Sequence, residues 1–94
     1  MPATESDVRN AVYHELQAIP YPRTISDQAV LKDFFSQIED QDNRNNLPIH
    51  RVNLFLHHLK TILGPFNLFR DDLVDPVAFP TVGDLVQRIF NLLP

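Results

Sequence analysis

The chain has 94 residues, 44% hydrophobic and 21% charged, a composition typical of one folded globular domain. It contains no cysteine, which excludes a disulfide scaffold and thiolate metal sites and favours a reducing, cytoplasmic location. The net charge is −4 and the basic residues are scattered, so we expect an acidic protein that binds no nucleic acid. No apolar run approaches the length of a membrane span and the N-terminus does not resemble a signal peptide, so we expect no membrane partner.

The sequence predicts a single helical domain over residues 1–94. The first helix is expected over about 7–18, and Pro20 and Pro22 should end it because proline breaks a helix interior. The second helix is expected over about 27–39. Its inward apolar face would be formed by Val30, Leu31, Phe34, Phe35 and Ile38.

The middle of the chain alternates between polar and apolar segments. Residues 39–46 are all polar and include three asparagines, which predicts a solvent-exposed loop. A third helix over about 48–63 has a regular apolar period and stops at Gly64. Residues 66–80 are apolar but interrupted by prolines, so we expect only a short turn near 70–74.

The last predicted helix covers about 81–93. Thr81 can cap it, and Asp84 three residues later completes a variant of the capping box. Its apolar stripe consists of Val82, Leu85, Val86, Ile89, Phe90 and Leu93. No segment alternates with the period of a strand for long, so the predicted fold class is all-α, a small four-helix bundle.

The order of these parts, with three local segments, resembles the acyl carrier protein-like family. The segments are Val30-Leu31-Lys32-Asp33-Phe34, the helix end Leu63-Gly64, and Thr81-Val82-Gly83-Asp84. The resemblance implies a divergent carrier, or a docking scaffold, in a multi-protein pathway. Its partner would be another protein, such as an acyl-transfer or synthase enzyme.

The attachment site of that family does not match. Carriers open their central helix with Asp-Ser-Leu, and the serine receives phosphopantetheine from coenzyme A. Here residues 45–48 read Asn-Asn-Leu-Pro, so the standard site is missing. Ser36 is the one candidate for attachment of phosphopantetheine, although Gln37 rather than an aliphatic residue follows it. We otherwise expect no cofactor.

A different class of function stays open beside the carrier hypothesis. The chain can equally be a helical protein–protein interaction module that is unrelated to acyl transfer. The partner-binding candidates lie on the basic third helix and in the apolar segment after it: His50, Arg51, His57, His58, Phe66 and Phe69. The sequence decides neither whether residues 66–80 are core or exposed surface nor what the oligomeric state is.

Catalytic and metal-binding patterns are missing. The histidines of the third helix, at 50, 57 and 58, have no carboxylate at a helical step beside them, so we expect a solvated face rather than a metal site. There is no Gly-x-Ser-x-Gly elbow, and two glycines are too few for a phosphate-cradling loop. The sequence therefore predicts a protein that is not an enzyme.

Overall fold

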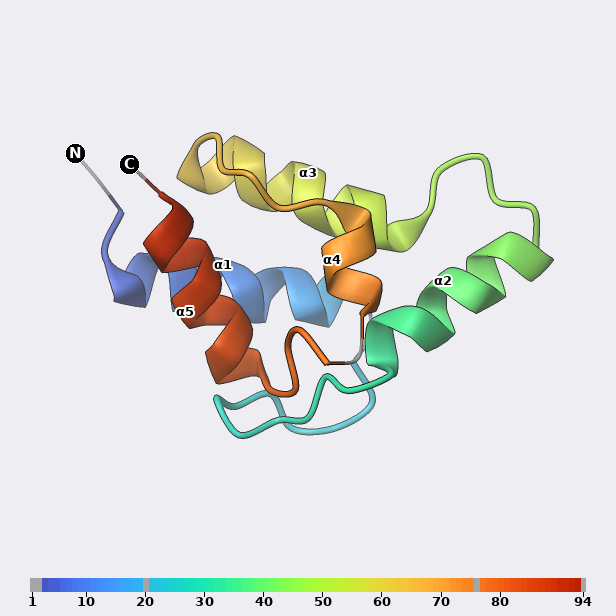
Figure 1. Ribbon diagram of the computed structural model, residues 1–94, viewed down its shortest axis with the longest axis horizontal. Helices are drawn as coiled ribbons and strands as arrows, with labels where there is room; N and C mark the ends of the chain where they lie inside the picture. Colours follow the sequence, from blue (N-terminus) through green and yellow to red (C-terminus); the bar gives the residue numbers. More distant parts are fainter. Residues whose placement is uncertain (1–2, 20, 76, 94) are drawn as a thin grey trace.

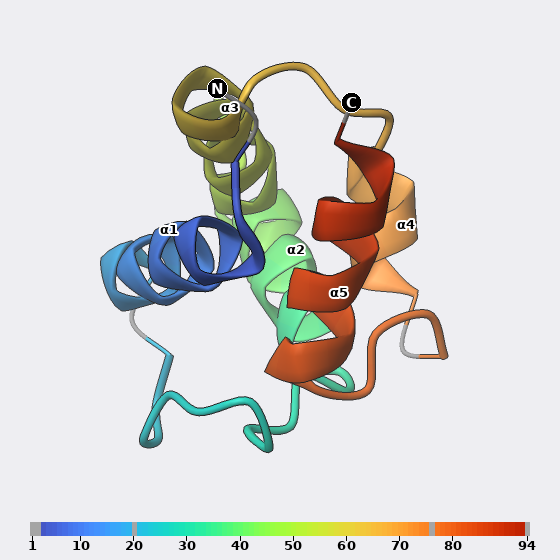
Figure 2. The same cartoon turned by 90° about the vertical axis from the view of Figure 1, so that its left-hand side faces the viewer.

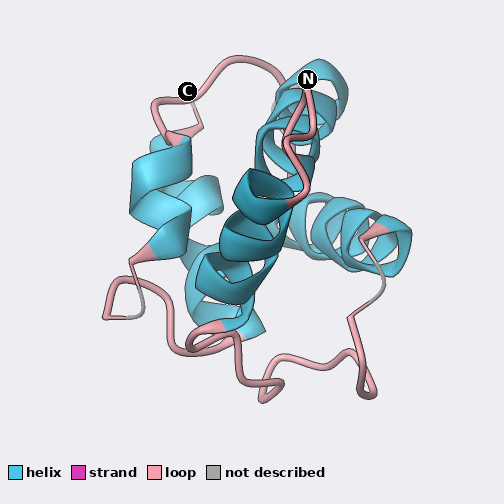
Figure 3. Cartoon of the chain, turned by 90° about the vertical axis from the view of Figure 1, so that its right-hand side faces the viewer, coloured by secondary structure: helices cyan, strands magenta, loops and turns pink. Residues whose placement is uncertain are grey.

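The computed structural model is all-helical, which confirms the predicted fold class (Figure 1). It describes residues 3–19, 21–75 and 77–93, so Pro20, which was expected to end the first helix, lies outside the described residues. The helices are α1 (Glu5–Ala18), α2 (Phe34–Arg44), α3 (Arg51–Leu63), α4 (Arg70–Val74) and α5 (Val82–Leu92). Within the described residues there is no strand (Figure 3). One isolated antiparallel bridge joins Val30 to Thr81.

Helix α3 contacts more of the other helices than any other helix of the described residues does. It packs against α1, α2 and α4, while α5 packs against α1. In Figures 1 and 2 α3 lies at the top of the molecule, and the connector between α1 and α2 runs along the bottom. The apolar faces of the helices meet in one core, whose largest fully buried side chains include Phe35, Phe55, Leu16, Leu31, Leu59, Leu68, Leu85 and Ile89.

Local signals set the ends of three helices. Thr4 and Asp7 form a capping box at the start of α1, and Thr81 and Asp84 form the predicted one at the start of α5. Helix α3 ends at Leu63 because Gly64 adopts φ = +100°, a conformation that favours glycine.

The second helix is displaced toward the C-terminus relative to the predicted 27–39, and that prediction is corrected. Residues 27–33 are not helical because their backbone is bonded to the start of α5. The Leu31 N–H donates to the Pro80 carbonyl at 2.8 Å, and the Val82 N–H donates to the Ala29 carbonyl at 2.9 Å. These non-local bonds compete with the i to i−4 bonds of a helix. Val30, expected in the core, is consequently 56% exposed.

The predicted polar loop at 39–46 is also wrong over most of its length. Helix α2 continues through it to Arg44, and Glu39 and Asp42 are buried rather than solvated. Helix α3 begins at Arg51 instead of near residue 48, and its first N–H, that of Arg51, donates to the Asp42 carboxylate at 2.8 Å. A helix start is thus capped by a side chain from the preceding helix.

The apolar segment 66–80 divides between core and surface. Phe66, Leu68, Leu73 and Phe79 are buried and close one side of the bundle. Phe69, in contrast, is 63% exposed. Pro76, in the same segment, lies outside the described residues.

None of the helices in the described part of the chain combines the length and the apolar character that crossing a lipid bilayer requires.

Leu59→Ala should destabilise the fold by about 2–5 kcal/mol, because Leu59 is 0% exposed and its removal leaves a cavity between α3 and its neighbours. The free energy of unfolding from urea titration measures the loss. Leu54→Ala on the same helix is the matched control, since Leu54 is exposed, and should cost less than about 1 kcal/mol. Equal losses at both positions would show that α3 is oriented differently.

Candidate functional site

Three carboxylates are buried within the described residues, and each contacts a basic side chain on α3 or at the residue just before it. They are Glu15 on α1 and Glu39 and Asp42 on α2. A carboxylate without a partner in the interior costs several kcal/mol, so these contacts decide which side chains of α3 remain available to a binding partner.

Asp42 and Arg51 form the most complete of these contacts. Asp42 is 0% exposed, and the Arg51 guanidinium reaches its Oδ1 from Nε at 3.0 Å and from a terminal nitrogen at 2.8 Å. Burial raises the pKa of Asp42, but the hydrogen bonds from the Arg51 side chain and backbone outweigh burial, so this pKa lies below its ordinary value. The pair fixes the turn between α2 and α3.

Glu39, on α2, contacts one basic side chain just before α3 and another at the start of α4. Its Oε1 contacts His50 Nδ1 just before α3, and its Oε2 lies 2.9 Å from Arg70 Nε at the start of α4. The carboxylate therefore joins α2 to both following elements.

Glu15 links α1 to α3 two helical turns after Arg51. Its Oε1 lies 2.8 Å from His58 Nδ1, and the His58 side chain is about half exposed. Because the histidine is only partly covered, His58 still borders the outer surface of α3.

The solvated face expected for the histidines at 50, 57 and 58 is found only in part, because His57 and His58 are exposed whereas His50 is half-buried. His50 and Arg51, two of the partner-binding candidates, are half-buried and bonded within the molecule. The sequence did show that no acid lies on α3 itself, but the acids come from other helices. Within the described residues no group of three or more histidine and carboxylate side chains is arranged for a metal ion.

The remaining candidates gather at the other end of α3. An open groove of about 620 Å³ lies between this helix, the segment after it and the end of α5. Its lining includes His57, Lys60 and Phe66, and no residue of the lining is a carboxylate. Phe66 is buried and forms the apolar floor.

Phe69 stands beside this groove and is held in place although it is exposed. The Lys60 ammonium lies 5.2 Å from the centre of the Phe69 ring and 5.6 Å from that of Phe66, distances of cation–π contact. The Phe69 N–H donates to the Asp72 carboxylate at 3.0 Å, which fixes its backbone at the start of α4. We name His57, Lys60, Phe66 and Phe69 the docking surface.

Ser36, the candidate for phosphopantetheine, faces α4. Its hydroxyl donates to the Val74 carbonyl, and the residue is half-buried. The hydroxyl therefore joins α2 to the end of α4.

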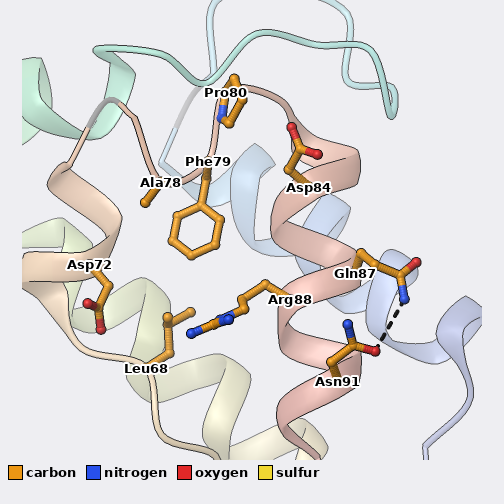
Figure 4. A pocket seen from close by; sticks show the side chains of 9 residues that line it. All are labelled: Leu68, Asp72, Ala78, Phe79, Pro80, Asp84, Gln87, Arg88 and Asn91. Carbon is orange, nitrogen blue, oxygen red and sulfur yellow. Dashed lines mark hydrogen bonds between the residues drawn. The ribbon is translucent and has the colours of Figure 1, made fainter.

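A second hollow, beside α5, carries charges of both signs (Figure 4). The Arg88 side chain extends across it toward Leu68, with Asp72 and Asp84 at its edges. Both carboxylates are hydrogen-bonded at helix starts, Asp72 to Phe69 and Asp84 to Thr81. The mixed charge selects neither anions nor cations, so this hollow is a weaker candidate than the docking surface.

No family model matches this chain, and neither a curated protein nor a solved structure matches it.

Arg51→Met should destabilise the fold by about 3 kcal/mol at neutral pH, because it leaves the Asp42 carboxylate buried without its ion pair. Above its unfolded pKa near 4, Asp42 contributes stability through a lowered folded pKa, and this contribution is lost as the pH falls. The difference between wild type and variant should therefore shrink below about pH 4. Urea titrations across that range measure it.

Two controls accompany this variant. Arg44→Met removes an exposed arginine that has no ion pair among the described residues, and should change stability by less than about 0.5 kcal/mol. Adding Asp42→Asn to Arg51→Met should restore part of the loss, because the buried charge is gone. A loss that does not change with pH would contradict the assigned ion pair.

Proposed function

We propose that this protein is a non-enzymatic docking scaffold that binds another protein through the docking surface on α3 and the segment after it. The observation that carries the proposal is Phe69, a large aromatic ring that is 63% exposed and nevertheless held by Lys60 and by its backbone bond to Asp72. Aromatic side chains that are ordered before binding lose little entropy on association and are frequent centres of binding energy.

The charges around the groove indicate the chemistry of the partner. The lining has Lys60 and His57 but no carboxylate, on a chain whose net charge is −4. A protein segment with acidic side chains beside an apolar one would match this arrangement, the apolar group above Phe66 and the acids near Lys60.

In line with the resemblance to carriers, we propose that this scaffold acts in a multi-protein pathway with acyl-transfer or synthase enzymes as its partners. The Ser36 hydroxyl supports a scaffold without a prosthetic arm, because it is half-buried and bonded to Val74. The interaction-module hypothesis uses the same docking surface and differs only in the identity of the partner.

Incubation with coenzyme A and a broad-specificity phosphopantetheinyl transferase should leave the intact mass unchanged. The enzyme needs an accessible serine hydroxyl, and that of Ser36 is covered by α4. Mass spectrometry with an authentic carrier protein as positive control measures the outcome. A gain of one phosphopantetheine that Ser36→Ala abolishes would make the protein a carrier and overturn the scaffold proposal.

The docking surface can be tested with a photo-crosslinking residue at position 69 in cells that contain the natural partner. The captured protein should then bind the purified chain, and Phe69→Ala should weaken that binding at least about tenfold. Lys60→Glu should weaken it as well, since it reverses the charge beside the groove. Isothermal titration calorimetry measures both dissociation constants.

The matched control is Val77→Ala, because Val77 is also apolar and exposed but does not line the groove. It should leave the dissociation constant within about twofold of wild type. If Phe69→Ala and Lys60→Glu bound the partner as tightly as wild type, the proposal would fail.

A further inference from the structure

A third hollow lies at the opposite end of the molecule from α3. The connector between α1 and α2, at the bottom of Figures 1 and 2, encloses about 520 Å³ together with the start of α2. The charged side chains that line it are Arg23 and Lys32. Thr24, Gln28 and Gln37 contribute neutral hydrogen-bonding groups.

The positive charge of this hollow is not balanced by nearby carboxylates of the described residues. Arg23 and Lys32 form no ion pair within that part of the chain, and no acidic residue lines the hollow. The connector has two acids. Asp27 already accepts from Arg9 Nε at 3.1 Å and from the Tyr13 hydroxyl at 2.6 Å. Asp33, next to Lys32, does not line the hollow. Two uncompensated cations in one hollow are notable on a chain of net charge −4.

The walls of the hollow are fixed without a ligand. The Tyr21 hydroxyl donates to the Val30 carbonyl at 2.8 Å and so joins the two walls. The Tyr21 ring meets Phe34 edge to face with centres 4.9 Å apart. The backbone bond from Leu31 to Pro80 anchors the connector to the start of α5. A site whose walls are already ordered loses little entropy when a ligand binds.

We propose that this hollow is a binding site for a phosphate monoester with an apolar body. Phosphate carries a charge of about −1.5 to −2 near pH 7 and three acceptor oxygens, which suit one guanidinium, one ammonium and neutral donors. The ester group would lie against the exposed Val30 side chain and Phe34. This site is separate from the docking surface and does not depend on the proposed scaffold function.

NMR titration of the isotope-labelled protein at constant ionic strength tests the site with three probes: inorganic phosphate, phenyl phosphate and a short phosphotyrosine peptide. We expect saturable shifts confined to the amides of residues 21–37, which include all of the lining, and phenyl phosphate should bind several-fold more tightly than inorganic phosphate. Arg23→Gln with Lys32→Gln should weaken each probe at least about tenfold. Both residues are exposed, so the thermal unfolding midpoint should be unchanged.

The control is Arg88→Gln, which removes another cation that has no ion pair among the described residues and should leave the affinities unchanged. Val30→Ala should reduce only the advantage of phenyl phosphate. If the peptide binds more tightly than phenyl phosphate, the site is upheld and its ligand is a phosphorylated side chain of a protein. If the two bind equally, the site is upheld and its ligand is a small molecule. Shifts that do not saturate, or that persist in the Arg23→Gln/Lys32→Gln variant, would overturn the proposal.

Discussion

The pairing of three buried carboxylates with the basic residues around α3 is the constraint on which the rest of the structure depends. Glu15 comes from α1, while Glu39 and Asp42 come from α2, and each needs a partner because an unpaired interior charge costs several kcal/mol. Arg51 and His58 of α3, and His50 just before it, supply these partners. The position and direction of α3 are therefore set by charge as well as by its apolar seam.

The same pairing divides the positive charge of α3 into two groups. At its start, His50 and Arg51 are occupied by Glu39 and Asp42, and they hold the turn from α2. Toward its end, His57 and Lys60 face a groove whose lining has no carboxylate. A helix that is basic in sequence thus exposes most of its unpaired charge at one end, beside Phe69. The proposed docking surface therefore lies where the basic side chains of α3 make no contact with a buried carboxylate.

Features controlled by neighbouring residues could be predicted from the sequence, and features controlled by distant ones could not. The cap at Thr81 and the stop at Gly64 depend on local geometry. The start of α2 depends on backbone bonds between residues 27–32 and 80–83, which have no local signature. The buried acids left a partial signal: Glu15 continues the apolar stripe of α1, three and four residues after two buried positions. The apolar pattern indicates that such an acid is buried but does not indicate which basic residue it contacts. His50 and Arg51 therefore could not be excluded from the candidate site by sequence alone.

The resemblance to acyl carrier proteins and the docking proposal rest on different parts of the molecule. A carrier depends on a serine at the start of the central helix, whereas the residues compared with that motif, Asn45 and Asn46, lie in the turn between α2 and α3 that the ion pair of Asp42 with Arg51 fixes. The docking surface lies at the far end of α3 and depends on Lys60 and the aromatic residues after it. The resemblance to carriers therefore concerns only the order of the helices and the proposed pathway. The proposal of a docking surface depends instead on the contacts of Lys60 and Phe69, and these contacts would favour binding in any small helical bundle.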